Sequence, residues 1–439
     1  MAVWRYELAL VVLVLLSFSS SSECAKILIF PGLGEATHSL APRMMGEKLV
    51  DRGHSVTMVT SSIFLNSSWH ASPSDRIPFI SYNSKYDREF ILGSMEEFIT
   101  KSVRGEMSAD VYFTQLNRSV EFFSSEMESV LGNYEVMKEL TEKSFDLALF
   151  DPFALFPLMV LERLGIPFVP LNAGFMPPSL ARLLGLPSNP SYVPEGLTAL
   201  SDRMSFTERV QNSLAAASFV LYKELFVNGF DEKRELWNIN TESSTANTLM
   251  TKAKIFLTNS DFVLDYPRPF LPHTVMLGSS LAKPPSQLSS GKLLDFLNSA
   301  GDTGVVLVSL GSFMTSMDQD KIDVLADAIS RLPYKVIWRT LPQLEPPTVA
   351  NNTLIMSWIP QNDVLAHPNV VAFVSNGGGH GAYESTFHAV PSVCIPFFTD
   401  HPDIANRLAT RGLGVVMNLQ TMTSDVLFNA INRVVTEPR

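Results

Sequence analysis

The fold is decided by residues 358–401, WIPQNDVLAHPNVVAFVSNGGGHGAYESTFHAVPSVCIPFFTDH. VVAFVS and PSVCIP are continuous apolar runs of the kind that form buried parallel strands. Between them, NGGGHG predicts a tight turn and AYESTFHA predicts the helix that follows it. Backbone amides at the start of a helix attract an anion, so we expect a diphosphate at this turn.

The same alternation extends outward in both directions along the chain. Further strands are predicted from KILIFPG, HSVTMVT, DLALFD, PFVPLN and KIFLTNS, and then from GVVLVSLGS, YKVIWRT and TLIMSW. Helices are predicted from His38 to Gly53 and from Gln319 to Arg331. The stretch LAKPPSQLSSG, residues 281–291, has the composition of a linker. The class is therefore α/β, with two doubly wound domains at 26–280 and 292–439.

Composition limits the function further. The 439 residues are 46% hydrophobic and 18% charged, and 33 basic residues against 44 acidic ones give a net charge of -11. We therefore expect no nucleic-acid partner. The two cysteines cannot form a disulfide framework, because Cys24 lies beside a predicted cleavage site and Cys394 lies in an apolar strand. We interpret Cys394 as a packing residue rather than a nucleophile.

Residues 1–25 predict a secretory signal peptide. They combine one Arg, an apolar core from Leu8 to Phe18 and small residues before Ala25. The apolar core is shorter than the roughly 20 residues that span a bilayer, which disfavours an uncleaved anchor. Glycosylation sequons at Asn66, Asn117 and Asn351 agree with a lumenal chain.

Polar residues cluster where the predicted strands end. His38 follows the first strand, Asp151 ends DLALFD, residues 309–312 end GVVLVSLGS, residues 376–381 follow VVAFVS, and residues 400–401 follow PSVCIP. Ligands of doubly wound sheets bind beyond the carboxyl ends of the strands. These clusters therefore predict the functional site.

With these motifs the chain resembles the animal UDP-glucuronosyltransferases, membrane-associated members of the GT-B glycosyltransferases. The segments PSYVPEGLTALSDRMSFTERVQN, VSLGSF, KVIWR and WIPQNDVLAHP match that family in order and spacing. The resemblance implies two Rossmann-like domains facing a central cleft, a UDP-sugar donor and a small lipophilic acceptor with a hydroxyl group. It implies no cofactor and no metal, a place in the lumen of the endoplasmic reticulum, and either membrane association or homo-oligomers.

The resemblance also assigns the catalytic residues. It implies that His38 takes the proton of the acceptor hydroxyl and that Asp151 orients His38. A paired carboxylate raises imidazole basicity and fixes its tautomer. Taken alone, His38 could be a helix-start residue and Asp151 an N-cap before Pro152. His54 is a rival base, but it opens a strand at the wrong end of the sheet.

For the donor, the resemblance implies that uracil stacks on Trp358 and hydrogen-bonds to Gln361. It also implies that Glu384 accepts from the ribose hydroxyls and that Asp400 holds the sugar hydroxyls. The phosphates are expected at the turn and at one serine: Ser312, Asn376, Gly377, Gly378, His380 and Gly381. Trp358 in a core and Glu384 on a solvated helix are the alternatives.

The sequence departs from the family pattern at three places. The turn usually begins with His and has Asn four residues later, but here Asn376 comes first and His380 second. After Asp400 the usual Gln is His401, an exchange that accompanies galactose preference in plant relatives. The family's membrane anchor follows the equivalent of Arg439, so we expect either an incomplete gene product or a lumenal chain without the anchor. The sequence does not decide whether the transferred sugar is glucuronate, glucose or galactose.

Several alternatives remain. Asp318 and Asp320 form an Asp-x-Asp pair, which could bind manganese but is more typical of a helix start. Arg339 could meet a sugar carboxylate or cap its strand. We expect the acceptor pocket from the apolar stretches 90–123 and 171–186. The alternative function is a catalytically weak protein that binds a UDP-sugar or a lipophile.

Overall fold

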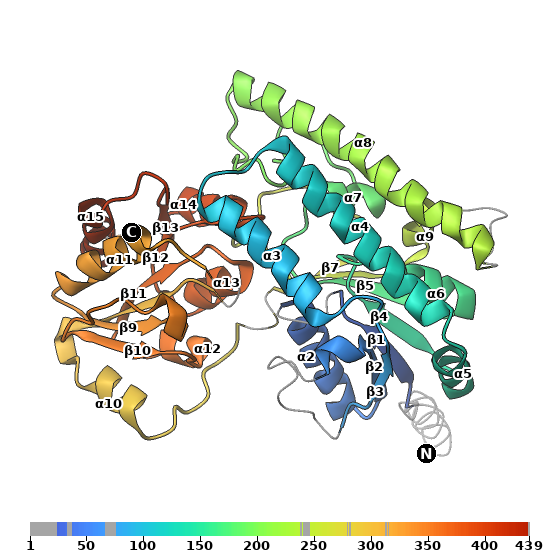
Figure 1. Ribbon diagram of the computed structural model, residues 1–439, viewed down its shortest axis with the longest axis horizontal. Coiled ribbons are helices and arrows are strands. Elements are labelled where there is room, and N and C mark those ends of the chain that lie inside the picture. Colours follow the sequence, from blue (N-terminus) through green and yellow to red (C-terminus); the bar gives the residue numbers. More distant parts are fainter. Residues whose placement is uncertain are drawn as a thin grey trace, which may run out of the picture.

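The computed structural model describes residues 24–32, 37–65, 76–237, 239, 246–278, 280, 282–311, 314 and 316–437. Figure 1 shows two α/β units side by side, each built around one parallel sheet with helices on its faces. The predicted α/β class with two doubly wound sheets is confirmed.

The first sheet has seven parallel strands in the order β3-β2-β1-β4-β5-β6-β7. They are β1 (Lys26–Phe30), β2 (Ser55–Ser61), β3 (Phe79–Tyr82), β4 (Leu147–Phe150), β5 (Phe168–Asn172), β6 (Phe256–Thr258) and β7 (Thr274–Met276). The order reverses between β1 and β4, where Phe30 pairs with Phe150 in register. The residues that follow these two strands therefore meet at one edge of the sheet.

The second sheet has six parallel strands in the order β10-β9-β8-β11-β12-β13. They are β8 (Val305–Ser309), β9 (Lys335–Arg339), β10 (Thr353–Met356), β11 (Val370–Ser375), β12 (Ser392–Cys394) and β13 (Gly414–Val416). Here the reversal lies between β8 and β11, and Ser309 pairs with Ser375. This sheet repeats the arrangement of the first.

Helices cover both sheets. In the first unit they are α2 (Thr37–Asp51), α3 (Arg88–Val103), α4 (Ala109–Leu131), α5 (Tyr134–Lys143), α6 (Phe156–Leu164), α7 (Pro178–Leu183), α8 (Phe206–Leu236) and α9 (Ala246–Leu249). In the second they are α10 (Lys292–Asn298), α11 (Gln319–Ser330), α12 (Gln361–Leu365), α13 (Gly379–Phe387), α14 (His401–Thr410) and α15 (Ser424–Thr436). Between the units, the described linker residues 282–290 form no helix or strand. The domain bounds 26–280 and 292–439 remain our proposal.

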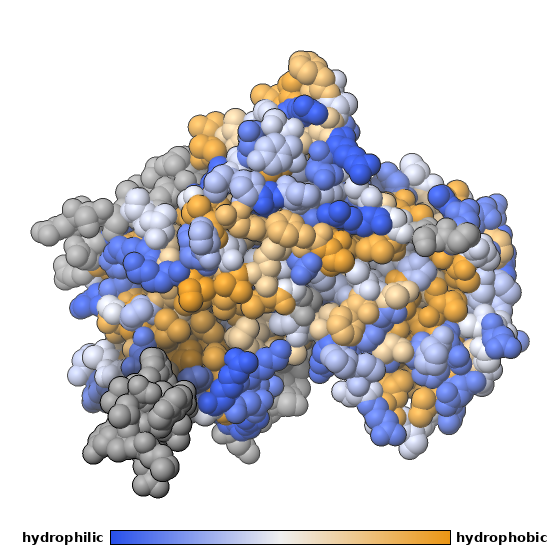
Figure 2. All heavy atoms as spheres, turned by 180° about the vertical axis from the view of Figure 1, so that it is seen from behind, coloured by the Kyte–Doolittle hydropathy of each residue, from blue (hydrophilic) through white to orange (hydrophobic). Residues whose placement is uncertain are grey.

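Apolar strands explain where the cores lie. Every residue of β5 and β8 is buried, as expected of central strands covered on both faces. The helices α3, α4 and α8 lie side by side in Figure 1. Figure 2 shows hydrophobic atoms at the projecting end of α8, where Phe206 is 83% exposed. No helix among the described residues is long and apolar enough to cross a membrane.

Candidate active site

The β1 and β4 ends bring together two residues that lie 113 positions apart in the chain, His38 and Asp151. The His38 Nδ1 is 2.6 Å from the Asp151 Oδ2. The Asp151 side chain is 0% exposed. An ionised carboxylate only accepts hydrogen bonds, so the His38 Nδ1 carries the hydrogen and its Nε2 is left with a free lone pair. That is the tautomer of a general base.

Asp151 is held in place by its neighbours. Its backbone N–H donates to the Phe30 carbonyl at 3.1 Å, and its Oδ1 accepts from the Phe153 N–H at 2.9 Å. A Cβ on Gly32 would come within 2.8 Å of the Asp151 Cγ, so only glycine lets the two loops approach this closely. Asp151 is not the N-cap of α6, since that position belongs to Leu155.

The surroundings of His38 set its basicity. Burial lowers the pKa of His38, but Asp151 and then Asp400 raise it, and the net pKa lies above its ordinary value. The Phe153 ring stacks on the imidazole with ring centres 4.2 Å apart. Asp151 thus orients His38 and Phe153 covers it. The negative charge of Asp400, which belongs to the second unit, raises the pKa of His38.

Across from His38, the glycine-rich turn joins β11 to α13. Gly377 has φ +76°, and a Cβ there would lie 2.9 Å from the His401 carbonyl oxygen. Asn376 accepts from the Gly378 N–H at 3.1 Å through its Oδ1, and its Nδ2 lies 3.4 Å from the His401 Nε2. The turn is therefore packed against the start of α14, and Asn376 is part of its internal bonding.

His380 occupies the place where the family pattern has Asn. Burial and the nearby charge of His38 lower the pKa of His380 to about 4, although the Ala173 carbonyl and Asp400 oppose this. Its buried Nδ1 finds no hydrogen-bond partner among the described residues. His380 is consequently a neutral imidazole with one nitrogen available to a ligand at the turn.

The residues expected to hold the nucleoside lie together. The Gln361 Nε2 donates to the Glu384 Oε2 at 2.5 Å. Burial raises the pKa of Glu384 to about 7, although its hydrogen bond from Gln361 lowers it. Trp358 is 62% exposed, so it is not the core aromatic of the alternative interpretation. Glu384 is buried and not solvated.

The expected sugar residues lie at the start of α14. Asp400 is exposed at the N-cap position, and its Oδ1 accepts from the Thr399 hydroxyl at 3.0 Å. His401 is buried, and burial lowers its pKa although Asp400 raises it. Ser312, the remaining phosphate candidate, lies outside the described residues.

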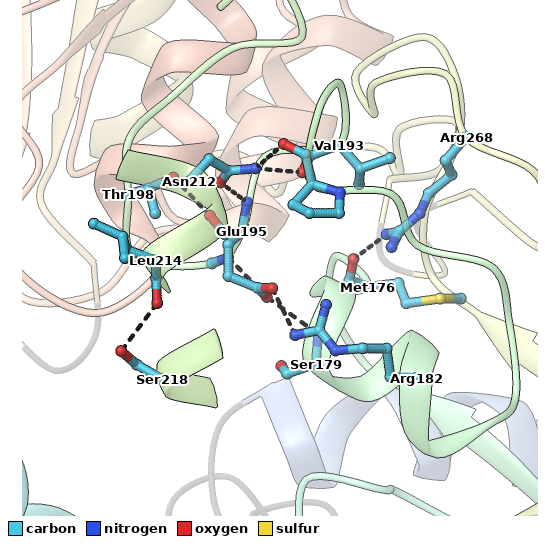
Figure 3. A network of polar contacts seen from close by, with 12 residues as sticks. Met176, Ser179, Arg182, Val193, Glu195, Thr198, Asn212, Leu214, Ser218 and Arg268 are labelled. Atoms are coloured by element: carbon cyan, nitrogen blue, oxygen red, sulfur yellow. Dashed lines mark hydrogen bonds and ion pairs between the residues drawn. The ribbon is translucent and has the colours of Figure 1, made fainter. Parts of the chain in front are cut away.

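A small hollow, referred to below as the cavity, lies at the edge of the first sheet. Phe122 and Phe123, from the expected stretch 90–123, line it together with the ends of β1, β2 and β3. The other expected stretch, 171–186, does not line this cavity. Arg182, its one charged residue, pairs instead with the buried Glu195 at 2.6 Å. Figure 3 shows that pair within a polar network that supports the loop around residue 195.

The network continues into the contact between the two units. Leu197 and Ala199 donate their N–H groups to the two carboxylate oxygens of Asp403 on α14, each at 2.6 Å. Arg407 of the same helix pairs with Asp265 at 3.1 Å. The Phe175 ring stacks on Tyr383 of α13 at 5.2 Å. These contacts hold the turn and α14 against the first unit.

Other candidates take structural roles. Asp318 occupies the N-cap position of α11 and Asp320 lies in its first turn, so the pair stands at a helix start as predicted. Asp318 makes no capping hydrogen bond, and its carboxylate pairs with Arg104 at 3.1 Å. Arg339 donates to the Gly311 and Ser357 carbonyls. Cys394 is buried, and burial raises the pKa of its thiol to about 12, although Ser375 lowers it. No metal-binding group of His, Cys, Asp and Glu occurs among the described residues.

Comparison with known proteins agrees with this geometry. A family model described as "UDP-glucoronosyl and UDP-glucosyl transferase" matches residues 25–439. The chain belongs to this UDP-glycosyltransferase family. It is 33% identical to UDP-glucuronosyltransferase 2A3 of Cavia porcellus over 98% of this chain and 81% of that protein. It is 32% identical to UDP-glucuronosyltransferase 2B7 of Homo sapiens over the same shares.

Solved structures confirm the GT-B fold of this UDP-glycosyltransferase. The glycosyltransferase of kitacinnamycin superposes with a TM-score of 0.63 at 18% identity, over 95% of this chain and 92% of that one. A UDP-glucose: anthocyanidin 3-O-glucosyltransferase in complex with UDP gives 0.62 at 16% identity, over 94% and 90%. The enzyme transfers a sugar from a UDP-sugar, and the weak-binding alternative is not favoured.

Sequence reasoning missed three residues of this site. Gly32 gives Asp151 its space, Phe153 covers His38, and Asp403 ties α14 to the first unit. The glycine directly after the first strand was a usable signal, because strand-end glycines often mark close backbone approach. Nothing local marks Phe153 or Asp403.

Proposed function

We propose that this UDP-glycosyltransferase moves glucuronic acid or another hexose from UDP to a hydroxyl of a small lipophilic acceptor, with inversion. His38 takes the acceptor proton through Nε2, and Asp151 holds the imidazole and balances its developing charge. The observation that carries the proposal is the hydrogen bond between the half-buried His38 and the fully buried Asp151, with Asp400 and His380 close enough for their charges to interact with His38.

The arrangement of the donor residues supports the same proposal. UDP lies on Trp358, Gln361 and Glu384, and its phosphates lie at the turn beside His380, where the backbone N–H groups at the start of α13 donate to phosphate oxygens. The helix start of α13 favours the negative charge that grows on UDP as the sugar leaves. No protein nucleophile, metal or cofactor takes part in this scheme.

The test is UDP release by the purified chain with UDP-glucose, UDP-galactose or UDP-glucuronate and a mixture of phenolic and steroid acceptors. We expect release that depends on the acceptor and that His38→Ala lowers by about 10²- to 10⁴-fold. His54→Ala is the matched control, because His54 precedes β2 at the opposite end of the sheet. Tight UDP binding without turnover for any donor would overturn the proposal.

We also propose that the protein enters the secretory pathway and resides in the lumen of the endoplasmic reticulum. The apolar segment of residues 1–25, which lies mostly outside the described residues, supports entry. The sequons at Asn117 and Asn351 have exposed asparagines, as a glycosylation site needs. Asn66 lies outside the described residues.

A further inference from the structure

Helix α3 belongs to the first unit by its place in the chain, but its last turn packs into the second unit. Figure 1 shows α3 reaching from the first unit toward α14 of the second. Ile99 and Val103 are 2% and 4% exposed, and they lie in one apolar cluster with residues of β8, β9 and β11. The end of α3 is therefore part of the core of the second unit.

Polar contacts also fix this end of the helix. The Ser102 side chain is buried, and its hydroxyl donates to the Phe397 carbonyl in the loop after β12. From the loop after β13, the Gln420 Nε2 donates to the Ser102 and Val103 carbonyls, each at 3.4 Å. The last turn of α3 is thus bonded to two separate loops of the second unit.

The loop that Ser102 contacts is strained. It consists of residues 396–400, between β12 and α14, and within it Thr399 has φ +50°. This left-handed conformation is unfavourable for a β-branched residue, and such strain persists only where surrounding contacts hold the backbone in place. Phe397 is 6% exposed and lies in the same apolar cluster as the end of α3. Helix α3 therefore holds the loop by both the ring and the carbonyl of Phe397.

The same loop carries Asp400 to the catalytic base. Burial lowers the pKa of His38, whereas Asp151 and Asp400 raise it, so Asp400 lies close to His38 across the two units. The resemblance to the family implies that Asp400 also holds sugar hydroxyls. Asp400 is three residues from Phe397, and a shift of the Phe397 backbone would therefore displace its carboxylate.

We propose that Ser102 positions loop 396–400, so that the first unit controls the affinity of the enzyme for the transferred sugar but not for UDP. The inference rests on the proposed function and on the expected role of Asp400 with sugar hydroxyls. Ser102 is a positioning residue, because it acts through Asp400. The proposed UDP contacts lie outside this loop.

The test is calorimetry of the native protein and of Ser102→Ala with UDP, UDP-glucose, UDP-galactose and UDP-glucuronate. Alanine favours a helix and removes one hydrogen bond, so the fold should persist. We expect the Kd of the UDP-sugar that supports turnover to rise about fivefold or more, and the Kd of UDP to stay within about twofold. Ser94→Ala is the matched control, because Ser94 lies on the same helix and donates to the Gln115 Oε1 at 3.2 Å inside the first unit.

Kinetics give a second readout. In Ser102→Ala the KM for the UDP-sugar should rise by more than kcat falls, and the KM for the acceptor should stay within about twofold. Kd values for UDP and for the UDP-sugar that change by the same factor, or that do not change, would overturn this inference and leave the transferase intact. Absence of UDP release from every donor by the native enzyme would count against the proposed function itself.

Discussion

At the scale of single residues, Asp151 determines both the tautomer and the basicity of His38. A base works only when deprotonated, so kcat/KM should fall as pH drops through the pKa of His38, which lies above 6.5. Asp151→Asn removes the charge that raises this pKa, while burial still lowers it. We expect the acidic limb of the pH profile to move to lower pH and kcat to fall by about 10²-fold or more.

The measurement is kcat/KM against pH for both proteins. Asp146→Asn is the matched control, because Asp146 lies just before the amino end of β4 and accepts from the Lys26 N–H at 2.7 Å. That variant should keep both the limb and the rate. If the acidic limb of the pH profile lies at the same pH in Asp151→Asn as in the native protein, His38 is not the titrating base.

Glu384 gives a second prediction at this scale. In the proposed donor site the ionised carboxylate of Glu384 accepts from ribose hydroxyls. Its pKa of about 7 means that lower pH protonates the carboxylate before UDP binds. We expect UDP to bind about tenfold more weakly near pH 6 than near pH 8. Calorimetry with UDP measures this change. Glu384→Gln should make UDP affinity nearly independent of pH over this range. A pH dependence as steep as that of the native protein would mean that UDP, and not Glu384, is the group that titrates.

At the scale of elements, the turn between β11 and α13 depends on backbone freedom. Gly377→Ala would place a Cβ 2.9 Å from the His401 carbonyl oxygen at φ +76°, so the turn and the start of α14 must separate. We expect a loss of about 1–3 kcal/mol in stability and at least about tenfold in UDP affinity. Thermal melting and UDP titration measure the two effects.

Gly165→Ala is the control for that prediction. Gly165 has φ +66° after α6, and a Cβ there would meet nothing within 4 Å. The variant should lose stability through backbone strain and keep its UDP affinity. If Gly377→Ala bound UDP as tightly as this control, the turn would not contact the phosphates.

The helices and strands also show how much of the fold the local sequence pattern predicts. Helix α11 ends within one residue of its predicted end, and the predicted strands occur because each is a short apolar run bounded by turn residues. The position of the acceptor pocket stays a prediction. Phe122 and Phe123 line the cavity, but 171–186 packs elsewhere, because an apolar stretch carries no information about which apolar partner it meets.

At the scale of the whole molecule, Asp403 couples the two units. Its carboxylate binds two N–H groups of a loop in which Leu197 and Ala199 have φ of 64° and 51°. Asp403→Ala frees that loop from α14 and loosens the alignment of Asp400 with His38. We expect kcat to fall about tenfold or more, while UDP affinity, which depends on the second unit, stays within about twofold.

The readouts are kcat at saturating substrates and UDP affinity by calorimetry. Asp425→Ala is the control, because Asp425 pairs with Arg331 inside the second unit at 2.6 Å. An equal loss of kcat and UDP affinity in Asp403→Ala would indicate local damage to α14 and contradict the coupling.

The sequence by itself determined the class of fold, the family and the residues that end each strand. Those features depend on short apolar runs and local turns, which a linear pattern records. Only the tertiary structure decided that His38 bonds to Asp151 across 113 residues, that Glu126 bonds to the Tyr82 hydroxyl, and that Asp403 joins the units. Such pairs arise from the packing of elements far apart in the chain, and no local spacing specifies them.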